Sequence, residues 1–334
     1  MAITNNALQL LDRYSPSSSE AFEPKPIAEP IVLVATVDDN YVMPMTVTVH
    51  SAFKNLKSST SRICLYVVDG GIKQSSKEKA EATLKSDRLE IIWLRPDLER
   101  LRIIPRGIIL AYYYRLLMAE ILPKEISKAI YLDADMIVLG DLQELWDMDM
   151  EDSFVMAAIN GNHLSTAPGL SNYRELKLDP KAEYFNAGLL VANLDKWRQT
   201  NIAAVFFDFF EKNKDTIKTH DQDILNAVLA GRWKKISSQW NQLPFFVYGP
   251  YAHDPKHNPF KDSETLHRVA TNPYVIHYGG MVKPWQLNCD HPSVPIFEKY
   301  LDETAWAGTR DSQLKKIKRK WNSFVRKYIR GFTF

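Results

Sequence analysis

The chain has 334 residues, of which 45% are hydrophobic and 25% are charged, with 13 glycines and 18 prolines. This composition is that of an ordinary globular protein and excludes a fibrous or mainly disordered chain. No apolar run approaches the roughly 20 residues that a membrane-spanning helix needs, and the start lacks the regions of a secretory signal. Two distant cysteines, Cys64 and Cys289, offer neither a disulfide framework nor a metal cluster, so we expect a reducing, intracellular setting.

Composition divides the chain into three parts. Residues 1–29 are rich in turn-forming residues and lack apolar periodicity, which is typical of a flexible extension. Residues 30–306 show no internal repeat and no compositional break, so we expect one domain of catalytic size there. Residues 307–334 form a basic tail. Eight basic residues and one acidic residue lie in 311–334, whereas the residues before them carry 34 basic and 39 acidic side chains.

Apolar, β-branched runs alternate with helical patterns from residue 31 onward. Strands are expected at residues 31–35, 63–68, 89–94, 129–132, 154–159, 188–191 and 274–277. Helices are expected at residues 77–84, 111–122, 196–211 and 221–230. The first of these helices has a plausible capping box in Ser75 and Glu78. Short connections between alternating strands and helices predict an α/β protein with a doubly wound sheet.

Two aspartates, Asp133 and Asp135, directly follow the predicted strand at 129–132. Ligands gather at the carboxyl ends of strands in open α/β sheets, and carboxylates at i and i+2 can share a hard divalent cation such as Mn²⁺ or Mg²⁺. The spacing alone is a weak signal, because two further pairs occur: Asp147/Asp149 and Asp221/Asp223. The pair at 147 and 149 lies in an acidic cluster that is typical of a solvated turn.

Two other polar blocks also follow predicted strands. The first strand leads into Asp38-Asp39-Asn40-Tyr41, without a glycine loop to cradle a phosphate. These side chains suit ribose hydroxyls and a stacked base, and an ordinary Asx turn is an equally good interpretation. The last strand leads into His277, Gly279-Gly280 and Lys283, which combine an imidazole ligand, an approachable backbone and a charge for a phosphate. A single histidine such as His277 is more often a core residue.

Together these blocks resemble glycosyltransferase family 8, most closely its bacterial lipopolysaccharide and lipooligosaccharide α-galactosyl- and glucosyltransferases. The resemblance runs from about residue 31 to the C-terminus. It implies a GT-A fold, Rossmann-like with a mixed central sheet flanked by helices, a UDP-hexose donor and transfer with retention of configuration. The blocks that carry it are Asp38-Asp39-Asn40-Tyr41, Tyr114-Arg115-Leu116, Tyr131-Leu132-Asp133-Ala134-Asp135, Leu145-Trp146-Asp147, Tyr184-Phe185-Asn186-Ala187-Gly188, Asp221-Gln222-Asp223-Ile224-Leu225-Asn226 and residues 277–285.

The resemblance also implies roles for individual residues. The uridine would contact Thr36, Asp38, Asn40 and Tyr41. The metal, Mn²⁺ or Mg²⁺, would bind Asp133, Asp135 and His277, with Ala134 beside it in the donor site. The phosphates would contact Gly280 and Lys283. The donor sugar and its transfer would depend on Arg115, Asn186, Asp221 and Gln222. Because an amide is a poor nucleophile, Gln222 favours a front-face substitution in which the departing phosphate accepts the acceptor's proton.

Two departures from the family pattern leave the donor open between galactose and glucose. Gly107 stands where galactosyltransferase relatives often carry a histidine. These relatives also carry an aspartate after the strand that ends here with Ala157-Ala158-Ile159-Asn160. Candidate lids over the donor are residues 101–109 and 278–285. Residues 161–181 and 245–266 are long enough to line an acceptor site, and surface loops are the alternative interpretation.

Apolar residues recur at helical spacing in the tail and fall on one face of residues 314–330, with basic residues filling much of the rest. They are Leu314, Ile317, Trp321, Phe324, Val325 and Tyr328. Such a segment is typical of an amphipathic helix in an anionic membrane interface, and a helix packed on the acidic body is the alternative. No recognition module accompanies the basic residues, so no nucleic-acid partner is expected.

We therefore predict a metal-dependent retaining glycosyltransferase with a UDP-hexose donor and a glycan or lipid-linked acceptor. We expect it to be cytoplasmic and peripheral on the inner face of the membrane. Two alternatives stay open: a family member that glycosylates a soluble acceptor or itself, and a non-catalytic protein that binds a UDP-sugar or a membrane. A nucleotidyltransferase would need phosphate-cradling features that this sequence lacks.

Overall fold

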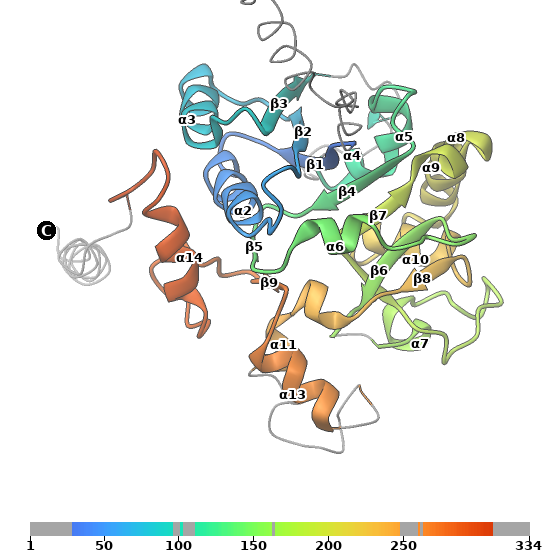
Figure 1. Ribbon diagram of the computed structural model, residues 1–334. Helices are drawn as coiled ribbons and strands as arrows, with labels where there is room; N and C mark the ends of the chain where they lie inside the picture. The colour runs from blue at the N-terminus through green and yellow to red at the C-terminus, as the bar shows by residue number, and fades with distance from the viewer. Residues whose placement is uncertain are drawn as a thin grey trace, which may run out of the picture.

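The computed structural model describes residues 29–95, 101–102, 111–161, 164–247, 260 and 263–309. In this part of the chain, a seven-stranded sheet has the order β3-β2-β1-β4-β7-β6-β8 (Figure 1). Its strands are β1 (Ile31–Val37), β2 (Ile63–Asp69), β3 (Leu89–Leu94), β4 (Lys128–Leu132), β6 (Val155–Ile159), β7 (Phe185–Asn193) and β8 (Trp233–Lys235). A separate pair of strands consists of β5 (Met136–Val138) and β9 (Val275–His277).

Helices cover the sheet on either side. The longer ones are α2 (Val42–Lys54), α3 (Gln74–Leu84), α9 (Ile202–Asn213), α10 (Asp221–Val228), α13 (Ser263–Thr271) and α14 (Val294–Leu301). The short ones are α4 (Ala111–Tyr114), η2 (Arg115–Leu117), α5 (Met118–Ile121), α6 (Leu142–Trp146), α7 (Thr166–Gly169), α8 (Leu194–Gln199), η3 (Ser238–Asn241) and α11 (Pro244–Val247). Helix α2 packs against α3 and α14, while α9 packs against α8 and α10 (Figure 1). None of the described helices has both the length and the apolar content for a bilayer crossing.

The sheet is mixed, as the resemblance implies. Strands β1 and β2 are buried at every position because helices and loops cover both of their faces. Strand β1 runs parallel to β2 and β4, whereas β7 runs antiparallel to β4 and β6. The predicted α/β sheet flanked by helices is confirmed.

This strand order brings polar residues to one edge of the sheet. The carboxyl ends of the parallel strands β1 and β4 lead into Asp38 and Asp133. The antiparallel strand β7 reaches the same edge with its amino end, and the Asp133 backbone nitrogen donates to the Gly188 carbonyl at 2.8 Å. The pairing of β5 with β9 sets His277 opposite Met136, just beyond β4. Segments far apart in the sequence therefore meet at this edge.

Three local predictions were wrong. The helix expected at 111–122 is divided into α4, η2 and α5. The helix expected at 196–211 is interrupted between α8 and α9, where Asn201 adopts a left-handed conformation that asparagine tolerates better than most residues. The capping box does not form, because α3 begins earlier, with Lys73 at its N-cap position and Ser75 inside its first turn. The Lys73 backbone nitrogen instead donates to Asp39 at 3.1 Å.

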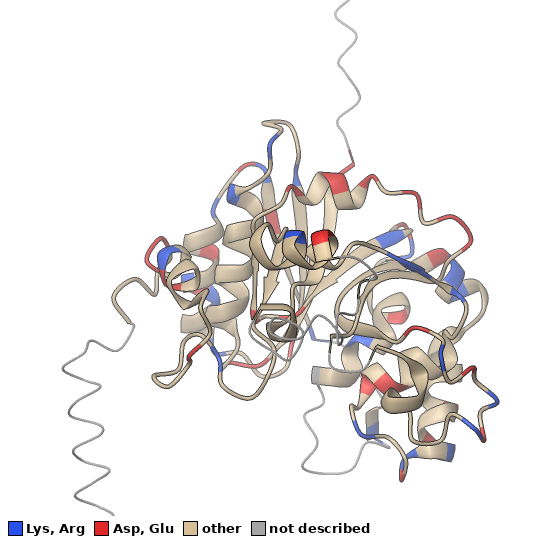
Figure 2. Ribbon diagram, turned by 90° about the horizontal axis from the view of Figure 1, so that it is seen from below, with Lys and Arg blue, Asp and Glu red and all other residues tan. Residues whose placement is uncertain are grey.

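Acidic and basic residues are interspersed along the described part of the chain (Figure 2). The predicted solvated turn is confirmed, because Asp147 and Asp149 are exposed after α6. Several predicted segments lie wholly or partly outside the described residues. They are residues 1–28 of the extension, residues 103–109 of the first lid with Gly107, residues 248–259 and 261–262 of the possible acceptor segment at 245–266, and the amphipathic segment at 314–330.

A buried carboxylate, Asp69, fixes the end of β2. Its Oδ1 atom accepts hydrogen bonds from the backbone nitrogens of Gly71 at 2.9 Å and Ile72 at 2.6 Å. Its Oδ2 atom forms ion pairs with Lys77 at 2.6 Å and Arg95 at 2.7 Å. Burial alone would raise the pKa of Asp69, but these donors together hold it well below its usual range.

We expect Asp69→Asn to lower the free energy of unfolding at pH 7 by about 3 kcal/mol, because the amide leaves Lys77 and Arg95 without their counter-charge. Since the folded pKa is depressed, the carboxylate stabilises the protein above the ordinary aspartate pKa of about 4 and loses this effect as the pH falls below it. Urea unfolding should therefore show a smaller loss at pH 3 than at pH 7, and an equal loss would contradict the assignment. Asp208→Asn is the control, because Asp208 forms an exposed ion pair with Lys212. It should change the free energy of unfolding by less than about 0.5 kcal/mol.

Candidate active site

Three potential metal ligands lie together at the sheet edge: Asp133, Asp135 and His277. Their ligand atoms all lie within 4.8 Å of one another. The Nε2 atom of His277 is 3.9 Å from Asp133 Oδ2 and 3.5 Å from Asp135 Oδ1. The predicted juxtaposition of a strand-end aspartate pair with the histidine after the last strand is thus present in the structure.

Asn241, which is completely buried, sets the orientation of the histidine ring. Its Nδ2 atom donates to Asn186 Oδ1 at 2.8 Å, so its Oδ1 atom is the one that lies 2.8 Å from His277 Nδ1. An amide oxygen only accepts, and therefore Nδ1 of His277 carries the proton. Nε2 faces the two aspartates, so in the neutral tautomer its lone pair is available on the side where a metal-binding imidazole needs it.

The residues of this cluster fit a divalent cation. Two carboxylates and a neutral imidazole form an oxygen-rich donor set that suits Mn²⁺ or Mg²⁺. Beside them, a Cβ atom at Gly188 would lie 2.5 Å from His277 Cε1 and 2.8 Å from Asp133 Oδ2. Any other residue at this position would fill the space between the ligands, so glycine keeps the cluster open.

The second aspartate of the cluster is buried and anionic. Lys283 Nζ lies 2.6 Å from Asp135 Oδ2. Burial alone would raise the pKa of Asp135, but His277 and Lys283 outweigh it and hold the pKa well below its usual range. Asp135 is therefore ready as a ligand at neutral pH. Lys283 is also close to the cluster, as a contact to a diphosphate would require.

A buried guanidinium connects the cluster to α10. The side chain of Arg115 donates to the Ala187 carbonyl at 2.7 Å and to Asp133 Oδ1 at 2.9 Å, and its Nε atom lies 3.0 Å from Asp221 Oδ2. This last approach is an ion pair without the alignment of a hydrogen bond. Burial raises the pKa of Asp221 to about 7, against the opposing effect of Arg115. Asp221 thus retains an acceptor oxygen inside the site.

The amides of Asn186 and Gln222 face each other across the start of β7. Gln222 Oε1 accepts hydrogen bonds from Asn186 Nδ2 and from the Ala187 backbone nitrogen, both at 3.0 Å. Asn186 Oδ1 in turn accepts from the Gly188 nitrogen at 3.0 Å. Asn226, one turn further along α10, joins the same two elements by donating to the Gln222 carbonyl at 2.9 Å and accepting from the Phe185 nitrogen at 2.8 Å. The orientation of Gln222 is therefore fixed.

The residues expected at the uridine lie at the end of β1. Asp38 accepts from the backbone nitrogen of Asn40 at 3.0 Å and from its side-chain amide at 3.2 Å, which is the Asx turn of the alternative interpretation. The Tyr41 ring is 37% exposed and meets the edge of Trp285 at 5.8 Å. Thr36 is buried, with its hydroxyl 3.2 Å from that of Tyr131. Between β9 and Lys283, Gly280 adopts a φ of +64° that favours glycine.

Sequence reasoning missed several supporting residues. Tyr131 donates to Asp133 Oδ1 at 3.0 Å, and the Arg115 guanidinium lies 4.2 Å from its ring centroid. Thr48 on α2 donates to the carbonyl of Ala134 at 2.9 Å. Tyr131 lies in a block that was already recognised, whereas Thr48 and Asn241 carry no sequence signal that separates them from other polar residues.

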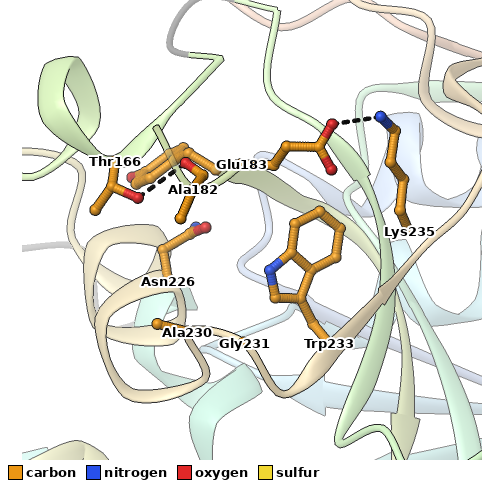
Figure 3. Close-up of a pocket in the computed structure, with 9 residues that line it drawn as sticks. Thr166, Ala182, Glu183, Asn226, Ala230, Gly231, Trp233 and Lys235 are labelled. Atoms are coloured by element: carbon orange, nitrogen blue, oxygen red, sulfur yellow. Dashed lines mark hydrogen bonds and ion pairs between the residues drawn. The ribbon is translucent and has the colours of Figure 1, made fainter. Parts of the chain in front are cut away.

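A cavity of about 200 Å³ lies beside α10 and β8 and shares Asn226 with the network that holds Gln222. Asn226 and Trp233 face each other across it, and an ion pair between Glu183 and Lys235 closes one side (Figure 3). None of the predicted site residues is among the described residues that line it. The polar side chains of Asn226, Glu183 and Lys235 are already engaged with protein partners. The sheet edge, rather than this cavity, holds the candidate chemistry.

Known proteins share both the sequence pattern and the fold. The model of glycosyl transferase family 8 matches residues 32–289. General stress protein A of Bacillus subtilis is 28% identical over 287 residues, which cover 82% of this chain and 94% of that protein. Lipopolysaccharide 1,3-galactosyltransferase of Salmonella typhimurium is 24% identical, with 81% of this chain and 77% of that protein covered.

A solved structure of galactosyltransferase LgtC, in complex with donor and acceptor sugar analogs, superimposes with a TM-score of 0.69 at 28% identity. The match covers 82% of this chain and 96% of that one. The family model spans most of the chain, and the mixed sheet agrees with the fold that the resemblance implied. The chain therefore belongs to glycosyltransferase family 8, with a GT-A fold.

Proposed function

We propose that this protein transfers a hexose, galactose or glucose, from a UDP-sugar to a glycan or lipid-linked acceptor, with retention of configuration and with Mn²⁺ or Mg²⁺. One observation carries the proposal: the cluster of Asp133, Asp135 and His277 adjoins both Lys283 and the buried pair of Arg115 and Asp221. A site for a cation and a diphosphate thus meets a site for a sugar.

The nucleotide end of the donor would lie along β1 and the glycine-containing loop after β9. Thr36, Asp38, Asn40 and Tyr41 would contact the uridine, and Gly280 and Lys283 the phosphates. Cleavage of the sugar–phosphate bond leaves negative charge on the departing UDP. Lys283 stabilises this charge, and a bound divalent cation would supply Lewis-acid stabilisation of the same leaving group.

The sugar end would lie among Arg115, Asn186, Asp221 and Gln222. The Oε1 atom of Gln222 already accepts two hydrogen bonds, which makes this amide oxygen an even weaker nucleophile. We therefore favour a front-face substitution over a covalent intermediate on Gln222. The acceptor oxygen bonds to the anomeric carbon as the bond to phosphate breaks, and the departing phosphate takes the acceptor's proton. Asp221 stabilises the positive charge that develops on the sugar.

Two observations support a lipid-linked glycan as the acceptor: the activities named for relatives, and the sequence of residues 314–330. Relatives of this chain include lipopolysaccharide 1,2-glucosyltransferase and 1,3-galactosyltransferase. The sequence at 314–330 alternates aromatic and aliphatic positions with lysine and arginine at helical spacing. A lipid-linked glycan at the inner face of a membrane would satisfy both, with the tail holding the enzyme at an anionic surface.

We expect UDP release from one sugar in a panel containing UDP-galactose and UDP-glucose, in the presence of Mn²⁺ and without any acceptor. EDTA should abolish the release, and Asp135→Asn should slow it more than about 100-fold, because the cluster loses a buried anionic ligand. Asp147→Asn is the matched control, since Asp147 belongs to an aspartate pair of the same spacing on an exposed turn, and it should keep full activity. Release that is equally fast with EDTA would contradict the metal-dependent proposal.

Gln222→Ala should lower the turnover number by about 100-fold and leave the affinity for UDP within about twofold, because Gln222 faces the sugar end of the site. Steady-state kinetics together with calorimetric titration of UDP separate the two effects. Gln199→Ala, at the exposed end of α8, should change neither. A parallel fall in UDP affinity would instead assign Gln222 a structural role.

Deletion of residues 311–334 should abolish sedimentation with phosphatidylglycerol vesicles while UDP release from the donor continues at the same rate. The expected reason is the loss of the eight basic residues of 311–334 together with the apolar face of this segment. Vesicles of neutral phosphatidylcholine, which should not bind the full chain, provide the control. Unchanged binding of the shortened chain to anionic vesicles would favour a tail packed on the protein body.

A further inference from the structure

His220, which immediately precedes α10 and the proposed sugar-binding residue Asp221, has an unusual backbone conformation. Its φ is +50° and its ψ is −123°, a combination that glycine adopts easily and other residues rarely do. Such conformations persist only where surrounding contacts enforce them, and they cluster at functional sites. The contacts of the His220 side chain therefore indicate the role of this strained backbone conformation.

The imidazole of His220 is held by two successive tyrosines of α4. Its ring stacks on Tyr112, with centroids 5.2 Å apart and planes inclined by only 12°. It also meets Tyr113 edge-on at 6.2 Å, with Nδ1 3.5 Å from the Tyr113 hydroxyl. Tyr113 is itself buried and packs edge-on against Phe210 of α9 at 5.5 Å. The ring of His220 is thus anchored to the protein core.

The same two chain segments meet a second time, one residue further along. Tyr112 and Arg115 are three positions apart in the consecutive helical elements α4 and η2, so they lie on one face. Their partners, His220 and Asp221, are consecutive. The stack of Tyr112 on His220 therefore lies beside the ion pair of Arg115 with Asp221, whose atoms approach to 3.0 Å. A shift of the first contact would displace the second.

The stacked pair is partly accessible to solvent and does not lie within the core. Tyr112 is 37% exposed. Its partner His220 directly precedes Asp221, the residue proposed to bind the hexose. The stacking contact lies where it can affect bound donor.

We propose that His220 is a positioning residue, which holds Asp221 against Arg115 and toward the donor sugar through its stack on Tyr112. This inference rests on the proposed function, because it assumes that Asp221 binds the hexose. Removal of the ring leaves the strained turn without its anchor, so the turn relaxes and carries the Asp221 carboxylate away from the sugar. The uridine residues at the end of β1 belong to another segment and stay in place.

The test compares affinities for UDP and for the accepted UDP-hexose, measured by calorimetry with Mn²⁺ present. In His220→Ala, the affinity for the UDP-hexose should fall at least tenfold relative to the affinity for UDP. The affinity for UDP itself should stay unchanged. His220→Phe, which retains an aromatic ring for the stack, should restore most of the lost UDP-hexose affinity. Tyr112→Ala should weaken hexose binding as His220→Ala does, and the double variant should be no worse than either single one, since both break one contact.

Two further variants keep the test decisive. His220→Gly suits the observed backbone and so retains the fold, yet it should lose hexose affinity because the turn is no longer anchored. Asn201→Ala replaces another residue of positive φ, at the start of α9, and should leave both affinities unchanged. Wild-type protein that binds no UDP at all would contradict the proposed function itself. Full hexose affinity in His220→Ala and His220→Gly, or a failure of His220→Phe to restore it, would overturn the positioning role.

Discussion

The buried guanidinium of Arg115 is the constraint on which the site depends. Burial would lower its pKa, but Asp133 and Asp221 outweigh this effect and raise it above its usual value, so the charge is held firmly. One cation between two carboxylates leaves a net negative charge. Burial, with a smaller contribution from Asp133, raises the pKa of Asp221 to about 7 against the opposing effect of Arg115. Negative charge is thus stored in a water-poor site, where a glycosyl group would become positive as it leaves phosphate. In the proposed role of His220, its backbone strain is the energetic cost of keeping Asp221 in this position.

Neutral amides determine the direction of a chain of hydrogen bonds beside that charge. Because Asn241 presents its oxygen to His277, its nitrogen must face Asn186 Oδ1. Asn186 then has only its nitrogen to offer, and Gln222 must receive it with Oε1. Reversal of any one amide would set oxygen against oxygen or donor against donor, so the tautomer of His277 and the orientation of Gln222 are coupled across the site. The proposed metal ligand and the proposed sugar contact are therefore prepared by one network.

Sequence reasoning succeeded where a local pattern determines the structure. The buried runs of β1 and β2 were placed within two residues, because strands covered on both faces are uniformly apolar. The partly buried strand β3 was placed with its observed bounds. Helix α2 was missed, since most of Val42–Lys54 is buried and rich in valine and threonine, so it shows neither a polar face nor high helix propensity. Asp133 and Asp135 could be chosen because they follow a strand. Asn241 could not, because its role depends on which side chains cross between η3, β7 and β9.

The loop after β9 combines two functions that the proposed chemistry needs in one short segment. It follows His277, the last residue of β9, turns through Gly279 and Gly280 at φ values of +47° and +64°, and returns with Lys283 on Asp135. Lys283 thereby contacts a carboxylate that the cluster also offers to a cation. A cation in the cluster and the Lys283 ammonium would repel each other at such a distance. Cation binding would therefore favour a conformation in which Lys283 turns toward an anion. A diphosphate is such an anion, and cation binding and leaving-group binding would then reinforce each other through Asp135.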